Sequence, residues 1–122
     1  MKKISPDIIT ALILTYNEED NIERVLNRLQ WLERIIIVDS HSTDRTLEIA
    51  TNYPNVKVYS RTFDTHATQW NYGLSLTNSK WILSLDADYI LTDDFVNEIQ
   101  KNLSEDKSAF FTKFKFLVFG KK

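Results

Sequence analysis

Cysteine is absent from this chain of 122 residues, and glycine and proline occur only twice each. Without cysteine the chain can form neither a disulfide framework nor a thiolate metal site, and its composition fits a reducing cytoplasm. The two glycines, Gly73 and Gly120, are too few for a Gly-x-Gly-x-x-Gly turn or a Walker loop. A bound phosphate would therefore need a partner other than a glycine-rich loop.

Long apolar runs and an excess of one charge are also missing. No run approaches the roughly 20 apolar residues that a membrane-spanning helix needs. The segment around Pro6 lacks the cleavage site of a secretory signal. The formal net charge of −2 offers no basic footprint, so we expect no nucleic-acid partner. We expect a cytoplasmic protein whose only membrane association is peripheral, at the inner face.

The chain does have a regular alternation of apolar runs and amphipathic stretches. This order is typical of βαβ units and predicts an α/β fold, with a mainly parallel sheet flanked by helices on both faces. No repeat or linker marks a second domain, so we expect residues 1–122 to form one domain or part of one. The predicted strands are Ile8–Thr15, Arg34–Asp39, Val56–Ser60, Trp81–Asp86 and an edge strand Ala109–Phe119; helices are expected after Asn17, after Asp44, around Ala67–Leu74 and from Thr92.

Polar residues follow three of the predicted strands. Thr15-Tyr-Asn-Glu follows the first strand, Asp39-Ser-His-Ser the second, and Asp86-Ala-Asp the fourth. Because the carboxyl ends of parallel strands share one rim, where open α/β sheets bind ligands, we expect these residues to converge. An acid after an early strand can accept a hydrogen bond from a ribose hydroxyl or a base imide. The sequence therefore predicts a nucleotide site.

The two carboxylates after the fourth strand indicate a divalent metal. Asp86 and Asp88 offer the oxygen ligands that Mg²⁺ or Mn²⁺ prefers, and such ions keep part of their shell for substrate phosphates. The alternative is that both are turn and cap residues. In the absence of a glycine-rich loop, the metal would neutralise a diphosphate and stabilise charge as the sugar bond to it breaks. This chemistry suits a transferase that releases a nucleoside diphosphate.

Four motifs, in order along the chain, resemble the family 2 glycosyltransferases. They are residues Ala11–Glu19, Ile36–Thr46, Asn71–Leu74 and Leu83–Asp88. The resemblance implies the GT-A fold, a Rossmann-like three-layer sandwich. It also implies inverting transfer of a sugar from a nucleotide sugar, usually a UDP-sugar, to a glycan or lipid-linked acceptor.

The same resemblance assigns site residues. Asp39 would contact uracil, and the acids of the fourth strand end would serve the ribose, the diphosphate and the metal. The implied nucleotide-binding residues are Thr15, Asn17, Glu18, Asp39, Ser40 and Asp86, and the implied metal ligands are Asp86 and Asp88. The segments Phe63–Asn71 and Phe116–Lys121 further resemble the subgroup that glucosylates the core of lipopolysaccharide.

The chain departs from this family in two ways. Many relatives have Lys or Arg before the Asn-x-Gly element, where this chain has Thr68, Gln69 and Trp70, so Arg61 or His66 becomes the candidate for assisting the diphosphate. The family's catalytic base is an acid well beyond the metal motif, and no Asp or Glu occurs after position 106. We therefore expect a C-terminally truncated, nucleotide-sugar-binding portion of a transferase, with its general base outside this chain.

Other interpretations stay open. A non-catalytic nucleotide-binding or assembly module would not need the missing base. An Asp-x-Asp phosphatase would also use strand-end carboxylates, although it would usually carry them on its first strand. Asn17 and Asp44 can act as helix caps. The alternating aromatic residues of Phe110–Phe119 would promote self-association if they were exposed.

Overall fold

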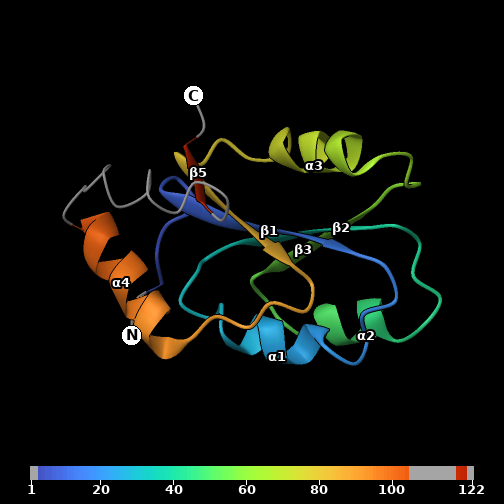
Figure 1. The fold of residues 1–122 in the computed structure, drawn as a ribbon, viewed down its shortest axis with the longest axis horizontal. Helices are drawn as coiled ribbons and strands as arrows, with labels where there is room; N and C mark the ends of the chain where they lie inside the picture. The colour runs from blue at the N-terminus through green and yellow to red at the C-terminus, as the bar shows by residue number, and fades with distance from the viewer. Residues whose placement is uncertain (1–2, 105–117, 121–122) are drawn as a thin grey trace.

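Strands and helices alternate along the chain, as the apolar pattern predicts (Figure 1). The computed structural model describes residues 3–104 and 118–120. In this part of the chain the elements are β1 (Ile9–Thr15), α1 (Ile22–Asn27), β2 (Ile35–Asp39), α2 (Thr46–Ala50), β3 (Val56–Ser60), α3 (His66–Leu74), β4 (Trp81–Asp86), α4 (Asp93–Ser104) and β5 (Val118–Gly120). The predicted bounds of β3 and β4 agree with the structure residue for residue, and β1 and β2 begin one residue later than predicted.

The sheet has the strand order β3-β2-β1-β4-β5. The pairs β1–β2, β1–β4 and β2–β3 are parallel, and β5 is antiparallel to β4. The chain therefore moves outward from β1 through β2 to β3, and then returns to the other side of β1 to form β4. Open α/β sheets bind ligands at the carboxyl ends of strands where the order reverses in this way, and here that point lies between β1 and β4.

Each face of the sheet buries its own apolar cluster, because successive side chains of a strand point to opposite faces. One cluster joins β1 to α1 and α4 and includes Ile9, Ile13, Ile22, Leu26 and Ile99. The other lies against α3 and includes Leu12, Ile36, Val38 and Ile82, with Trp70, Tyr72 and Leu74 of the helix. Figure 1 shows α3 on one side of the sheet and α1 and α2 on the other. The predicted three-layer α/β fold is confirmed.

Gly73 allows α3 to approach β1 closely. A Cβ atom added at Gly73 would lie 2.5 Å from Cδ1 and 2.9 Å from Cδ2 of Leu12, a buried residue of β1. These distances are shorter than a van der Waals contact, so only glycine fits without a shift of the neighbouring side chain. This close packing of α3 on the sheet places the amino end of α3 near the carboxyl ends of β1 and β2.

One sequence prediction is wrong, and another lies partly outside the described residues. Asn17 was expected to cap the following helix, but α1 begins only at Ile22, and its N-cap position is Asn21. Asn17 has a φ of 52° and its side chain binds a different loop, so that prediction is wrong. Of the predicted strand Ala109–Phe119, residues 109–117 lie outside the described part of the chain. Among the described helices, none is both long and apolar enough to cross a membrane.

Candidate functional site

The strand register brings the three polar strand ends together. Thr15, the last residue of β1, lies opposite Asp39, the last residue of β2. On the other side of β1, Leu14 lies opposite Asp86, which ends β4. The sequence predicts this convergence only in general terms, from the shared rim of parallel strands. The register makes it specific, since the three ends are neighbours in the hydrogen-bonded sheet.

Asp39 is fully buried and binds groups of the protein itself. One carboxylate oxygen, Oδ1, accepts hydrogen bonds from Thr15 Oγ1 and from Ser42 Oγ, both at 2.6 Å. The other, Oδ2, accepts one from the backbone N–H of Ser42 at 2.8 Å. The side chain has 0% of its surface exposed. Asp39 therefore fastens the loop after β2 to the end of β1, and it has no exposed surface to offer a ligand in this conformation.

Asn17 joins the loop after β1 to the loop after β2. Its side-chain oxygen accepts hydrogen bonds from the backbone N–H groups of Thr43, at 2.8 Å, and Asp44, at 3.4 Å. Its own backbone N–H donates to Ser42 Oγ at 2.8 Å. The positive φ of Asn17 is a conformation that asparagine tolerates better than most residues. Asn17 thus fixes the position of the two loops relative to each other.

Glu18 has a buried oxygen without a partner in the described part of the chain. Its backbone N–H donates to Thr46 Oγ1 at 2.8 Å, which links the same two loops again. Its side-chain Oε2 is shielded from solvent, and no described group donates to it. A buried carboxylate oxygen without a donor is costly, and a ligand hydroxyl or a cation would satisfy it. Glu18 therefore fits the predicted role at a ligand site better than Asn17 does.

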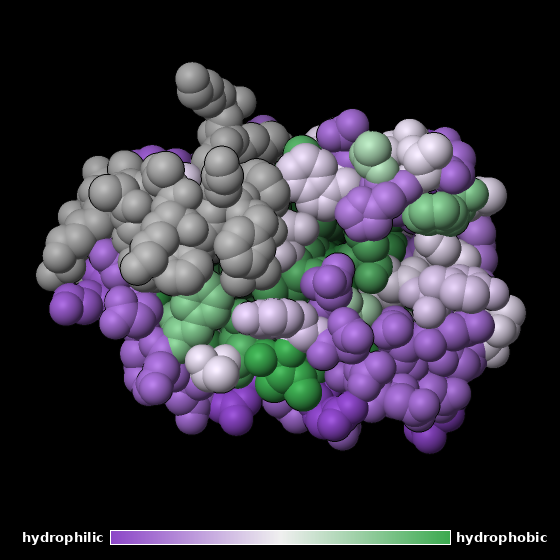
Figure 2. Space-filling model, in the orientation of Figure 1, coloured by the Kyte–Doolittle hydropathy of each residue, from purple (hydrophilic) through white to green (hydrophobic). Residues whose placement is uncertain are grey.

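A hollow of about 430 Å³ lies at the carboxyl ends of β1 and β2, against α3. It is lined by Leu14, Thr15, Tyr16, Ser40, Phe63 and His66. Tyr16 and Phe63 are large apolar side chains with 59% and 51% of their surface exposed. The volume falls in the range of small-molecule sites, and exposed aromatic side chains beside polar hydroxyls suit a flat, polar-edged ring. In Figure 2, hydrophobic surface is visible in the recess below α3, next to hydrophilic surface over α2.

Asp86 lies beside this hollow, since its register partner Leu14 lines it. Both Asp86 and Asp88 are exposed to solvent. Among residues 3–104 and 118–120, no group of three or more His, Cys, Asp or Glu side chains is placed to hold a metal ion. Mg²⁺ and Mn²⁺ are nevertheless often bound by one or two carboxylates together with substrate phosphates and water. The pair thus fits a metal that a bound diphosphate completes, and not a metal caged by protein alone.

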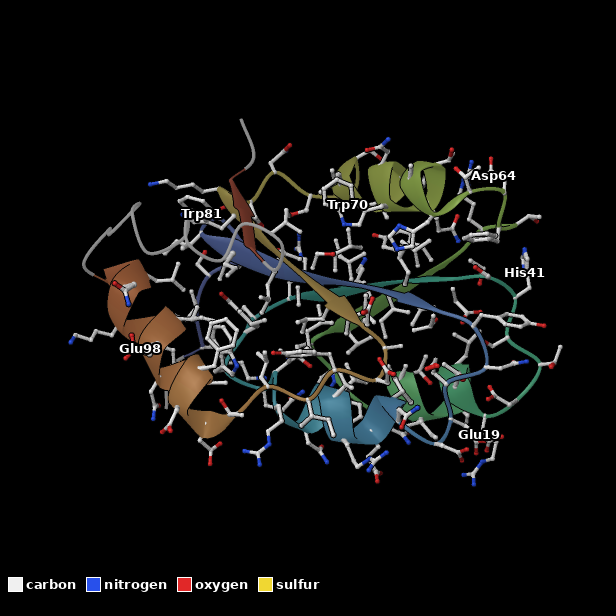
Figure 3. All side chains as sticks on the ribbon, viewed as in Figure 1. Glu19, His41, Asp64, Trp70, Trp81 and Glu98 are labelled. Atoms are coloured by element: carbon white, nitrogen blue, oxygen red, sulfur yellow. The ribbon has the colours of Figure 1, made fainter. Side chains whose placement is uncertain are left out.

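Arg61 is engaged in the fold and does not face a ligand freely. Its Nη1 donates to Gln69 Oε1 at 2.9 Å and to Asp64 Oδ1 at 3.2 Å, and its guanidinium lies 5.6 Å from the ring centre of Tyr72. The N–H of Thr65 and the side chain of Arg61 lower the pKa of Asp64, so this pair stays ionised. Of the two groups suggested for the diphosphate, His66 is the one that lines the hollow. Figure 3 shows Asp64 and His41 at the same end of the molecule.

Three residues of this region were not among the predicted site residues. Tyr16 and Phe63 line the hollow together with His66, and Gln69 of α3 is buried and bonded to Ser40 at its edge. The sequence held one usable signal for Gln69: it lies four positions before Gly73, on the same helical face that meets the sheet. Phe63 begins the segment Phe63–Asn71 that resembles a subgroup of the family, but that resemblance gave Phe63 no role at the site.

Comparisons with known sequences all lead to glycosyltransferases. The sequence model of glycosyl transferase family 2 matches residues 10–116. An uncharacterised glycosyltransferase of Rickettsia bellii is 33% identical over 101 residues, which cover 82% of this chain and 34% of that protein. The glycosyltransferase SunS of Bacillus subtilis is 30% identical over 103 residues, covering 82% of this chain and 24% of SunS. The match thus spans about a third of the length of the first relative and about a quarter of the second.

Solved structures show the same fold. TarS of S. aureus, residues 1–349 in complex with UDP-GlcNAc, superimposes with a TM-score of 0.70 at 24% identity, covering 80% of this chain and 31% of TarS. Glucosyl-3-phosphoglycerate synthase of Mycobacterium tuberculosis, in complex with Mn²⁺, UDP and glucosyl-3-phosphoglycerate, gives a TM-score of 0.58 at 21% identity, covering 66% and 33%. The parallel sheet flanked by helices is therefore the arrangement seen in these enzymes.

Proposed function

Because this chain belongs to glycosyl transferase family 2, we propose that it binds the nucleotide-sugar donor, a UDP-sugar, for transfer of the sugar with inversion. The observation that supports this most directly is the hollow at the carboxyl ends of β1 and β2, with the exposed acids of β4 beside it. The complexes of TarS with UDP-GlcNAc and of the mycobacterial synthase with UDP and Mn²⁺ support the choice of donor. We extend it to this chain on family membership.

The base, in this proposal, occupies the hollow beside Tyr16 and Phe63. Both side chains offer exposed aromatic surface, and the stacking of a ring on such a surface stabilises the complex. Thr15 and Ser40 supply polar atoms at the edge of the hollow. Asp39 and Asn17 act indirectly, by holding the two loops that form this edge. Glu18 is kept as a ligand contact because its buried oxygen lacks a donor among the described residues.

The diphosphate then extends from the hollow toward Asp86 and Asp88. A divalent metal, Mg²⁺ or Mn²⁺, would be held by these carboxylates together with the phosphates. When bound, the metal would act as a Lewis acid that stabilises the negative charge of the departing UDP. The chain has no glycine-rich loop to share this task, so we expect the metal to be essential for donor binding.

The experiment is a titration of the chain with UDP in the presence of Mn²⁺, of Mg²⁺, and of EDTA. We expect binding only with metal, and we expect Asp88→Ala to abolish it because one of the two acids is lost. Asp94→Ala is the matched control, since Asp94 is also exposed but lies in the first turn of α4 and does not line the hollow. Binding of equal strength in EDTA, or unchanged binding by Asp88→Ala, contradicts the proposal.

The acceptor is assigned on sequence resemblance only. We propose a glycan or a lipid-linked acceptor such as the core of lipopolysaccharide, at the cytoplasmic side of the membrane, where the protein would associate peripherally. Self-association through the C-terminal strand belongs to the same set of proposals. The alternative is a module that binds the donor without turnover. It is distinguished from a transferase by measuring whether the sample that binds UDP also forms UDP from a UDP-sugar. Release of UDP from a UDP-sugar by that sample contradicts the module.

A further inference from the structure

Gln69 is a buried polar residue that connects α3 to the ends of two strands. None of its side-chain surface is exposed. Its Oε1 accepts a hydrogen bond from Arg61 Nη1 at 2.9 Å. Its Nε2 donates to the backbone oxygen of Arg61 at 3.1 Å and to Ser40 Oγ at 3.2 Å. All the hydrogen-bonding atoms of this amide therefore have protein partners, and one of these partners, Ser40, lines the hollow.

The orientation of the Gln69 amide is determined by its partners. A guanidinium can only donate hydrogen bonds, so the atom facing Arg61 Nη1 must be the oxygen. A backbone carbonyl can only accept, so the atom facing the oxygen of Arg61 must be the nitrogen. A flipped amide would place like groups against each other at both contacts. The NH₂ group therefore faces Ser40.

This orientation also decides what the Ser40 hydroxyl can do. Because Nε2 of Gln69 has hydrogens and no free lone pair, Ser40 Oγ accepts this hydrogen bond. The backbone of Ser40 is fixed as well, since its N–H donates to the backbone oxygen of Thr15 at 3.0 Å. The hydroxyl hydrogen of Ser40 has no acceptor among the described residues. It remains free to donate to a molecule in the hollow.

We propose that Gln69 is a positioning residue that makes Ser40 a hydrogen-bond donor to a carbonyl oxygen of the bound uracil. The inference rests on the proposed function, since it takes the nucleoside end of UDP as the occupant of the hollow. It goes further, because it assigns a direction to one contact with the base and names the buried residue that sets it. A hydroxyl held in this way is ready for the ligand before binding, which reduces the ordering cost.

A double-mutant cycle on Ser40 and Gln69 tests the connection. Ser40→Ala removes the donor and should weaken UDP binding about 3- to 10-fold, the effect of losing one neutral hydrogen bond. Gln69→Glu keeps the size and the hydrogen bond from Arg61 Nη1, but it loses the bond to the backbone oxygen of Arg61. It also offers Ser40 only an acceptor, so the hydroxyl turns toward residue 69 and away from the base. We expect Gln69→Glu to weaken binding by a similar factor alone and to have no further effect in the Ser40→Ala background. Equal effects in both backgrounds overturn the proposal.

Two exposed or remote positions provide matched controls. Ser75→Ala removes a hydroxyl at the opposite end of α3, where it donates to the backbone oxygen of Tyr72. Gln30→Glu adds the same charge beside α1, where the amide donates to the backbone oxygen of Leu26. Both control variants should bind UDP as the unsubstituted chain does, and circular dichroism should show that all variants are folded.

A second measurement does not depend on the folding of the Gln69 variant. Replacing a base oxygen by sulfur weakens its acceptance of a hydrogen bond, so the chain should bind either 2-thio-UDP or 4-thio-UDP several-fold less tightly than UDP. The Ser40→Ala variant should not distinguish that analogue from UDP. If the chain binds UDP and both analogues equally, this inference is wrong while the proposed function stands. If it binds no UDP at all, both are wrong.

Discussion

Replacement of Asp39 by alanine should destabilise the protein strongly, although Asp39 lies at the rim of the candidate site. The carboxylate is fully buried and accepts hydrogen bonds from Thr15 Oγ1, from Ser42 Oγ and from the N–H of Ser42. Removing it leaves these donors without their acceptor at the junction between β1 and the loop after β2. The two hydroxyls can rotate toward other groups, but the backbone N–H cannot.

The magnitude follows from the number of donors left without a partner. A buried donor without an acceptor costs about 1–3 kcal/mol, and hydroxyl rotation should leave one or two such groups here, giving about 1–6 kcal/mol. Part of this loss is offset because a buried charge no longer has to be desolvated. Since small domains are stable by about 5–15 kcal/mol, the variant should still fold, with a much lower unfolding midpoint.

Urea unfolding followed by tryptophan fluorescence measures this loss by linear extrapolation. Asp44→Ala is the matched control. Asp44 also accepts three hydrogen bonds, two from Thr46 and one from the N–H of Glu19, but it lies nearer the solvent, where water can replace it. We expect a clearly smaller loss for Asp44→Ala. Equal losses for the two variants, or a larger loss for Asp44→Ala, would refute the argument that burial makes Asp39 the stronger anchor.

Two further predictions concern packing and pH. Gly73→Ala should lower the free energy of unfolding by about 1–3 kcal/mol, because the added Cβ overpacks against Leu12. Leu12→Val in the same chain should reduce that loss, since valine lacks the Cδ atoms that clash. If the losses of the two substitutions simply add, this explanation is wrong. Burial raises the pKa of Asp44, but hydrogen bonds from Thr46 and Glu19 outweigh it and lower the pKa below the ordinary 3.8. The stabilising contribution of the Asp44 carboxylate is therefore complete above pH 3.8, and it is lost as the pH falls through the lower pKa of the folded state. Unfolding midpoints measured across this pH range should therefore fall less steeply for Asp44→Asn than for the unsubstituted chain.

The elements of the fold were predictable because their signals are local. Runs such as Val56–Ser60 and Trp81–Asp86 are bounded by polar residues, and the structure places both strands over the predicted ranges. Helix starts were harder. Asparagine is common at helix N-caps, yet the side chain of Asn17 binds the backbone of Thr43 and Asp44 on another loop. A residue that can bind its own helix can equally bind a neighbour, and only the position of that neighbour decides between them.

The site divides in the same way. The sequence determined that polar residues follow β1, β2 and β4, because strand ends and parallel pairing can be inferred from hydrophobic pattern and chain order. It could not distinguish Asp39 from its neighbour Ser40. In the tertiary structure Asp39 is buried among Thr15 and Ser42, whereas Ser40 lines the hollow.

The alternation of strands and helices and the polar residues at the strand ends are therefore properties of the sequence, since each depends on local pattern and general rules of chain connection. The order of the strands in the sheet is known only from the tertiary structure. Which of these residues hold the loops together and which line the hollow was decided by the tertiary structure. Gln69 illustrates the reason: its partners Arg61 and Ser40 lie on other elements, and the orientation of its amide depends on which donor and which acceptor those elements bring to it. Hydrogen bonds between distant residues have no periodic signature in the chain, so they are visible only once the packing has placed both partners.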